Sequence, residues 1–483
     1  MTAGVPVLFL QDNAINESLA LCDLAGVLEA AGHPTLLLLE DEEPDLAGAI
    51  RQADPALVVV PSGVGGHETA RRLAAAARAH APGATIVMGG THATFDPTEA
   101  LRPEVDAVVV GEAERPVAAL AAHLSAGTDW RGVGSLAWDD GGQLVQNPLL
   151  APIEDLDALP HPHRDLYYRY PFIRRFGWKK FNTSRGCVHS CTFCWNPSLR
   201  RLMPDGVSFT RRKSPERAVD EVVALRARHP LTSVHFADDL FTVGVGWLER
   251  FAPLWRARVG LPFTCSSSIE LVTERSVAAL AAAGCRGVAI GLETGNERIR
   301  SRILKKTVTN DDVRRSAALI KGHGMELTTY NMLACPGETL DDAWSTVRLN
   351  QEIGADFCRV TLAVPIPHTD FEREAIAAGH LDPADLDARV DALNTGRAGF
   401  RSVDSRAFSN LFYLFRVAVH HPRLLPAIRR AVHLPLGRAL TPFKLAMALE
   451  ERRINRLGWV DGARYFRHVG DPRKRTTNYV TLM

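Results

Sequence analysis

Over residues 1–128, short apolar runs alternate with segments of helical periodicity. The apolar runs have the length of buried strands, and they are Val5–Leu10, Thr35–Leu39, Leu57–Pro61, Thr85–Met88 and Asp106–Val110. Between them, Leu21, Leu24 and Leu28 recur at helical spacing, and Glu68–His80 reads as an alanine-rich helix. Near-continuous apolar strands separated by helices predict a doubly wound parallel α/β sheet with helices on both faces.

A second strand–helix rhythm covers residues 179–370. Its predicted strands are Lys179–Ser184, Val234–Phe236, Phe263–Ser266, Val288–Leu292, Leu327–Leu333 and Arg359–Val364. The predicted helices between them are Glu216–Arg228, Trp247–Val259, Glu274–Ala283, Asp311–His323 and Asp341–Ile353. A closed barrel needs eight such units, so six predict an open, partial (β/α)6 barrel.

Two further segments complete the predicted domain organisation. Residues 129–178 are a connector, in which Ser135–Asn147 is typical of a hairpin that turns at Asp140-Gly141-Gly142. Residues 371–483 are a helical C-terminal domain, basic from Arg397 onward, with an apolar stretch at Phe408–Val419. This domain is open to three interpretations: a lid over a substrate, a helix pair on a membrane surface, or a solvated basic face.

Composition narrows the function classes. The 483-residue chain has a formal net charge of +1, so no global field argues for a nucleic-acid partner. It holds eight cysteines, three of them clustered, which fits a reducing compartment better than a disulfide framework. No window reaches the length of about 18 apolar residues that a transmembrane span needs, and no signal peptide is evident. We therefore expect a cytoplasmic protein.

The main candidate chemistry is the run from Ser184 to Trp195, which holds Cys187, Cys191 and Cys194 in the spacing Cys-x-x-x-Cys-x-x-Cys. It follows a predicted strand, so the thiols lie on a loop beyond a strand end. Soft thiolates select zinc, copper(I) or iron–sulfur centres. Structural zinc takes four protein ligands, so a zinc loop would need a distant fourth ligand. Three thiolates suit a 4Fe–4S cluster that keeps one iron open.

The predicted strand ends of the first 128 residues carry a second set of candidates. Open parallel sheets bind ligands at the carboxyl ends of their strands. The residues at these ends are Ser62, Gly89, Gly90, Thr91, His92, Gly111 and Glu112. The two adjacent glycines would let a ligand approach the backbone closely, although they could equally serve only to turn the chain.

The cysteine spacing, with the aromatic Phe193 before the last cysteine, resembles the signature of radical S-adenosylmethionine (SAM) enzymes. The preceding Gly-Gly-x-His-x-Thr and Val-Gly-Glu segments are similar to the cobalamin-binding domain of class B radical SAM proteins. Ala14 stands where many other cobalamin proteins have a cobalt-ligating histidine, so the resemblance implies cobalt without a histidine lower ligand. His92 could substitute, but we expect it beside the nucleotide tail or facing solvent.

The resemblance implies three cofactors: a 4Fe–4S cluster on the three cysteines, SAM and cobalamin. Asp238 and Asp239 stand where the family contacts the SAM amino group, and Glu293 lies in a segment similar to the family's SAM-contacting Gly-x-Glu. An alternative for each carboxylate is a position at a helix N-terminus, where the helix dipole stabilises its negative charge. Cys335 replaces a leucine of the family's Gly-Leu-Pro-Gly-Glu-Thr, so its thiol is a candidate proton or hydrogen-atom donor, or a buried core residue.

The implied function is a cobalamin-dependent radical SAM C-methyltransferase. In such enzymes the cluster reduces SAM to give a 5′-deoxyadenosyl radical, which takes hydrogen from an unactivated carbon, and methylcobalamin then supplies the methyl group. An oxidative cyclase or rearrangement enzyme of the same class is one alternative, and a non-catalytic cobalamin and iron–sulfur sensor is another. The implied partners are a small-molecule substrate, such as a lipid-like compound or natural-product intermediate, and an external one-electron donor such as a flavodoxin.

Overall fold

The computed structural model describes residues 4–14, 17–63, 66–385, 400 and 403–443 of the chain. These residues form two compact units. The first comprises the chain up to Phe176 together with Leu202–Phe209, and the second comprises Gly177–Arg201 and the described residues from Thr210 onward.

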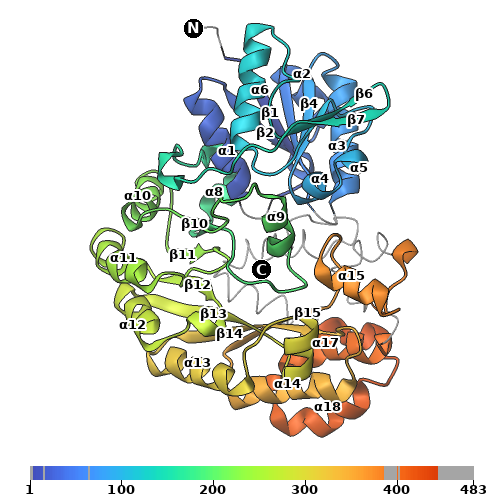
Figure 1. The fold of residues 1–483 in the computed structure, drawn as a ribbon. Helices are drawn as coiled ribbons and strands as arrows, with labels where there is room; N and C mark the ends of the chain where they lie inside the picture. The colour runs from blue at the N-terminus through green and yellow to red at the C-terminus, as the bar shows by residue number, and fades with distance from the viewer. Residues whose placement is uncertain (1–3, 15–16, 64–65, 386–399, 401–402, 444–483) are drawn as a thin grey trace. The chain divides into compact units, whose positions relative to one another are not determined.

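The first unit is built on a seven-stranded sheet in the order β2-β1-β3-β4-β5-β6-β7 (Figure 1). The parallel strands are β1 Val7–Gln11, β2 Thr35–Leu39, β3 Leu57–Pro61, β4 Thr85–Gly89 and β5 Ala107–Val109. The helices are α1 Leu19–Ala30, α2 Leu46–Ala53, α3 His67–His80, α4 Thr91–Phe95, α5 Pro97–Ala100 and α6 Glu114–Ala126. The predicted doubly wound parallel sheet is confirmed.

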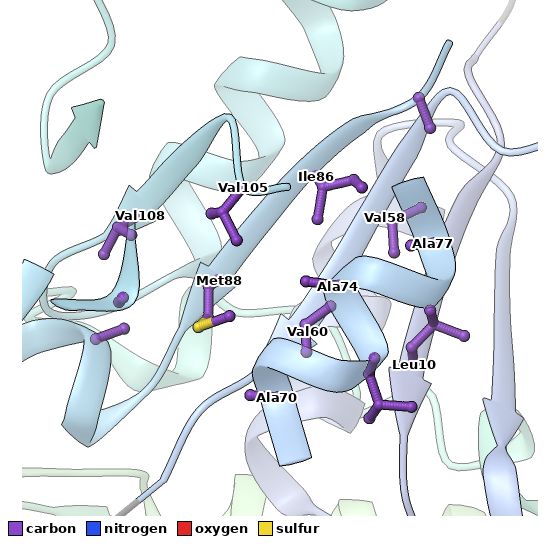
Figure 2. Close-up of a cluster of buried hydrophobic side chains, with 14 of the residues drawn as sticks. Leu10, Val58, Val60, Ala70, Ala74, Ala77, Ile86, Met88, Val105 and Val108 are labelled. Atoms are coloured by element: carbon purple, nitrogen blue, oxygen red, sulfur yellow. The ribbon is translucent and has the colours of Figure 1, made fainter. Parts of the chain in front are cut away.

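The predicted hairpin also forms, as β6 Leu136–Asp140 and β7 Gln143–Gln146. It pairs antiparallel with β5, so it extends the sheet. One side of this sheet packs on α3, whose Ala70, Ala74 and Ala77 lie one helical turn apart and are all buried. Figure 2 shows these small side chains against Val58, Val60 and other strand residues, where they let the helix lie close to the strands.

The connector after the hairpin packs onto α1 and the ends of β1 and β2. It contains α7 Asp165–Tyr168 and α8 Pro171–Arg175. The hydroxyl of Tyr167 donates to Gln11 Oε1 at 2.7 Å, and that of Tyr170 donates to Glu43 Oε1 at 2.7 Å. The amide of His163 donates to the Cys22 carbonyl of α1 at 2.8 Å. The connector therefore completes the first unit.

The second unit is built on six parallel strands in the order β15-β14-β13-β12-β11-β8. They are β8 Trp178–Phe181, β11 Ser233–Phe236, β12 Phe263–Ser267, β13 Cys285–Glu293, β14 Glu326–Leu333 and β15 Phe357–Leu362. The helices between them are α10 Pro215–Arg226, α11 Val245–Arg258, α12 Glu274–Ala283, α13 Asn310–Gly322 and α14 Leu340–Glu352. Because β8 and β15 do not pair, the barrel is open, which confirms the predicted partial (β/α)6 architecture.

Among the described residues, four further helices belong to the later part of the chain or to the cysteine loop: α9 Asn196–Leu202, α15 Asp370–Ala377, α17 Ser405–His420 and α18 Leu425–Ala431. The apolar stretch at Phe408–Val419 lies within α17, which packs against α14 and β15. Its apolar side is thus buried on the second unit, with Leu411 and Phe415 fully covered. Within the described residues, no helix combines the length and the apolar character needed to cross a membrane.

Gly26 of α1 offers a test of how the connector docks. A β-carbon at this position would lie 2.5 Å from the His161 carbonyl oxygen. Glycine to alanine in a helix normally stabilises by about 0.5–1 kcal/mol. We expect Gly26→Ala instead to destabilise the protein by about 1–3 kcal/mol, as other overpacked contacts do. Denaturant unfolding followed by fluorescence measures the difference.

The matched control is Gly246→Ala in α11, where nothing lies within 4 Å of the added β-carbon. That variant should be neutral or slightly more stable. Equal effects of the two substitutions would contradict the close packing of the connector on α1.

Candidate functional site

The three cysteines lie on the loop that leaves β8. The loop passes through β9 Ser184–Arg185, which pairs antiparallel with β10 Arg211–Arg212, and it ends where α9 begins. All three thiols are free and partly exposed. The amide of His189 points at Cys187 Sγ at 3.5 Å, and that of Asn196 points at Cys194 Sγ at 3.4 Å. Backbone donors aimed at sulfur favour the thiolate that a metal centre needs.

Two anchors hold this loop. At its base, Asp238 Oδ1 accepts from the Thr183 amide at 2.9 Å and the Thr183 hydroxyl at 2.8 Å, and it also accepts from the Ser184 hydroxyl. In its middle, the Thr192 hydroxyl donates to the Ile303 carbonyl at 2.6 Å, and the Thr192 amide donates to Leu304. The cysteines are therefore carried by a segment fixed both at the end of β11 and on a π-helical turn, Ile299–Ile303.

The three thiols suit a cluster better than a single structural ion. Structural zinc takes four protein ligands, whereas the loop offers three free thiols. In a 4Fe–4S cluster each thiolate binds a different iron, so three thiols leave one iron open.

The electrostatics of the thiols are set by burial. Burial raises the pKa of Cys191 to about 12 and that of Cys194 to about 11, and it also raises the pKa of Cys187. The Lys306 ammonium opposes this rise at Cys187 and Cys191. The thiols therefore keep their protons until a metal displaces them, which is how metal binding couples to proton release.

The three predicted SAM-binding carboxylates all lie at the carboxyl ends of strands in the second unit. Asp238 is 3% exposed, and its Oδ2 has no hydrogen-bond partner among the described residues. Asp239 Oδ2 accepts from Asn196 Nδ2 at 3.0 Å, and burial raises the pKa of Asp239. Glu293 ends β13 and pairs with Lys306 Nζ at 3.1 Å. An unpaired buried carboxylate oxygen is a strong acceptor for an ammonium group.

Phe193 and Cys335 meet in one apolar cluster. The side chain of Phe193 packs against buried residues that come from several elements, namely Ile299, Leu304, Cys335, Ala363, Phe371, Ala375, Leu381 and Phe400. Cys335 is fully buried there, and burial raises the pKa of its thiol well above the usual range. The structure therefore places this thiol in the core beside the cysteine loop, and its role as a donor stays a prediction.

Glu338, three residues after Cys335, is a buried acid that our sequence interpretation did not select. Its Oε2 accepts from the Cys335 amide at 2.8 Å, while its Oε1 has no hydrogen-bond partner in the described part of the chain. Burial raises its pKa to about 8. In the sequence, the only signal that could have pointed to Glu338 was its place in the segment Pro-Gly-Glu-Thr.

The raised pKa of Glu338 predicts a pH dependence of stability. Between its ordinary value, near 4.5, and about 8, the unfolded chain loses this proton while the folded protein keeps it. Stability should therefore fall as the pH rises through this window and level off above it. Glu338→Gln should remove this part of the slope, measured as denaturation midpoints at pH 5, 6.5 and 8. Asp341→Asn, at an exposed acid nearby, should keep the wild-type slope; an unchanged slope in Glu338→Gln would contradict the assignment.

The candidate residues of the first unit lie at the carboxyl ends of β3, β4 and β5. The amide of Ser62 donates to the Gly89 carbonyl at 2.6 Å, and the amide of His92 donates to the Ser62 carbonyl at 3.1 Å. Gly90 has φ +120°, and a β-carbon there would lie 2.6 Å from the Ser62 carbonyl oxygen. Thr91 begins α4 directly after it. The structure thus brings these residues together in a turn that requires glycine.

Gly111 and Glu112 follow β5 at the same edge of the sheet. The Gly111 amide donates to Thr94 Oγ1 at 3.1 Å, whereas Glu112 Oε2 accepts from the Ile153 amide of the connector at 3.0 Å. The Ser62 hydroxyl is buried without a hydrogen-bond partner in the described part of the chain. An orphaned hydroxyl and close backbone turns at a strand-end edge are what a bound nucleotide-like tail would use, so these residues fit cobalamin.

His92 belongs to a cluster that the sequence did not reveal. Its Nε2 lies 3.6 Å from Glu99 Oε2, and its ring stacks on His67 with the ring centroids 4.9 Å apart. Burial lowers the pKa of His92, and His67 lowers it further. The ligand atoms of His92, Asp96 and Glu99 lie within 4.8 Å of one another, but Arg71 Nη2 already pairs with Glu99 at 2.5 Å. In the sequence, the spacing of His92, Asp96 and Glu99, by four positions and then three, was the signal that could have revealed this cluster.

Removal of single cysteines tests the cluster. We expect Cys187→Ala, Cys191→Ala and Cys194→Ala each to lose most of the iron and sulfide that the wild-type protein takes up on anaerobic reconstitution. Cys285→Ala, at a buried cysteine outside the loop, should retain both. Iron and sulfide analysis with electron paramagnetic resonance (EPR) measures this. Tetrahedral zinc in place of the cluster would contradict the assignment.

Comparison with known protein families matches both units. Residues 181–349 match the radical SAM superfamily, and residues 12–121 match the B12 binding domain. The chain is 27% identical over 343 residues to an uncharacterised methyltransferase of Pyrococcus horikoshii, covering 69% of this chain and 72% of that protein. It is 26% identical to the cytidylyl-2-hydroxyethylphosphonate methyltransferase of Streptomyces wedmorensis, covering 62% of this chain and 63% of that protein.

A relative with a different activity is the anaerobic magnesium-protoporphyrin IX monomethyl ester cyclase of Synechocystis, which is 25% identical and covers 65% of this chain and 64% of that protein. Among solved structures, the cobalamin-dependent SAM radical enzyme OxsB, with aqua-cobalamin and SAM bound, superposes with a TM-score of 0.69. That match covers 93% of this chain and 71% of OxsB at 14% identity, and it therefore supports the fold.

The fold, the cysteine loop and the strand-end edge of the first unit define a radical SAM enzyme that carries a cobalamin-binding domain. The chain belongs to the family of cobalamin-dependent radical SAM methyltransferases. Its cofactors are accordingly a 4Fe–4S cluster, SAM and cobalamin.

Proposed function

We propose that this enzyme transfers a methyl group to an unactivated carbon of a small-molecule substrate. The observation that carries the proposal is the presence, in one chain, of a cobalamin-binding domain and a loop of three free thiols at the open end of a partial barrel. When bound, the cluster supplies one electron for the cleavage of SAM to a 5′-deoxyadenosyl radical, and the corrin carries the methyl group.

The residues of the second unit would hold the cluster and orient SAM. Cys187, Cys191 and Cys194 supply three ligands, which leaves one iron for the amino and carboxylate groups of SAM. The Oδ2 of Asp238 is the acceptor we assign to the SAM ammonium group, because it is buried and has no hydrogen-bond partner in the described part of the chain. Asp239 follows it directly after β11, and Glu293 ends β13, two strands along the sheet; we assign both to the same ligand.

The apolar cluster around Phe193 would exclude water from the reacting atoms. A reactive radical must be kept from side reactions with solvent. Cys335 lies in this cluster, and its thiol stays protonated, so it could give a hydrogen atom only if the packing around it opened toward substrate. We keep this donor role as a secondary proposal.

In the first unit we assign Ser62, Gly89, Gly90, Thr91, His92, Gly111 and Glu112 to cobalamin binding. The support is their position at the edge where three parallel strands end and the unpaired Ser62 hydroxyl among them. We further propose a lipid-like or natural-product substrate and a one-electron donor such as a flavodoxin. We also propose a cytoplasmic location, which the free thiols support because they require reducing conditions.

A second candidate function is oxidative cyclisation or rearrangement on a ring system, which the similarity to the Synechocystis cyclase favours. The two functions differ in their products. Methyl transfer consumes a second SAM as methyl donor and releases S-adenosylhomocysteine, whereas cyclisation needs no methyl donor.

Product analysis separates these functions. Anaerobically reconstituted protein with cobalamin, SAM and a strong reductant should form S-adenosylhomocysteine together with 5′-deoxyadenosine, quantified by mass spectrometry. The Cys191→Ala variant should form no 5′-deoxyadenosine, because it lacks a cluster ligand. 5′-deoxyadenosine without S-adenosylhomocysteine would overturn methyl transfer in favour of cyclisation. Binding of SAM without any cleavage would instead support a non-catalytic sensor.

A further inference from the structure

Lys306 is a buried cation next to the cysteine loop. Its side chain is 10% exposed, and its ammonium donates to the Gly291 carbonyl at 2.7 Å and to Glu293 Oε1 at 3.1 Å. Burial lowers the pKa of an amine, but here the nearby acidic groups, Glu293 foremost, outweigh burial and raise the pKa of Lys306. The group is therefore a permanent positive charge at neutral pH.

The backbone at the end of β13 is shaped around this ion pair. Glu293 adopts the left-handed conformation, with φ +62°, and the register with β14 is irregular between Gly291 and Glu293. A β-carbon at position 291 would contact Glu293 Oε1 and would lie 2.8 Å from Lys306 Nζ. A non-glycine residue in this conformation is strained, so the surrounding contacts must hold it there. Gly291 leaves the space, and Glu293 folds back into it.

The same segment is fastened to the cysteine loop. Thr192 lies between Cys191 and Phe193 and bonds to the carbonyls of Ile303 and Leu304, just before Lys306. The Lys306 amide donates to the Arg300 carbonyl at 2.9 Å, which fixes its own backbone. Lys306 thus follows, two residues later, the segment that anchors the cysteine loop.

We propose that Lys306 is a positioning residue that tunes the bound cluster. Its ammonium offsets the negative charge of the cysteine loop and raises the reduction potential of the cluster. Glu293 holds the ammonium in place and limits that rise. The inference rests on the proposed 4Fe–4S cluster. Reduction adds one negative charge to a cluster, and a nearby cation stabilises the reduced form more than the oxidised form. In a partly buried site this Coulomb interaction is only weakly screened.

The test is a redox titration of the reconstituted protein without SAM, followed by EPR. We expect Lys306→Met to move the midpoint potential to more negative values and Glu293→Gln to move it to more positive values. The matched control is Lys305→Met. Lys305 is the adjacent lysine, but its side chain is 51% exposed and pairs with Glu374, so its loss should leave the potential at the wild-type value.

Two outcomes would overturn the inference: a fully loaded Lys306→Met protein with the potential of the Lys305→Met control, or shifts of the same sign in Lys306→Met and Glu293→Gln. If Lys306→Met fails to retain the cluster, cluster retention is compared between Lys306→Arg, which keeps the charge, and Lys306→Gln, which removes it. Retention restored by arginine alone supports a charge effect, whereas equal retention with glutamine overturns it. These results are separate from the proposed function, which falls if the wild-type protein takes up no cluster.

Discussion

Every proposed property of the second unit depends on how firmly the cysteine loop is held. Three thiols bind one cluster more readily when their relative positions are already fixed, and a polar loop of this length has no apolar core of its own. The structure supplies the constraint from outside. One carboxylate oxygen of Asp238 takes three hydrogen bonds from the loop's base, and Thr192 joins its middle to the π-helical turn. The loop therefore takes its shape from two segments that are distant in sequence, the end of β11 and the π-helical turn.

The fold was largely predictable because it follows from periodicity. Runs such as Leu57–Pro61 are apolar at every position, and only a strand covered on both faces has that pattern. The hairpin at Ser135–Asn147 was equally predictable from its Asp-Gly-Gly turn. Nothing in its residues, however, indicated that it would join the main sheet. Strand neighbours are set by tertiary packing, and a local pattern carries little information about them.

The candidate site was predictable where chemistry imposes a spacing. Cys187, Cys191 and Cys194 are recognisable because a cluster requires thiolates close together in the chain. Lys306 carries no such mark, since it follows another lysine and its partner lies thirteen residues earlier. Glu338 was likewise hidden, because a carboxyl that loses its charge on burial looks in sequence like any exposed acid. Long-range electrostatic pairs form only after the strands align, and a single sequence does not report them.

Helix α17 lies against β15, one of the two unpaired edges of the six-stranded sheet, and Arg416 Nε donates to the Cys358 carbonyl of that strand at 2.9 Å. An uncovered edge of this kind recruits other strands and promotes aggregation. Helix α17, which ends at His420, therefore covers this edge of the sheet and shields its backbone groups. Protein engineers who exchange C-terminal regions between such enzymes to alter substrate choice should place the junction after this helix.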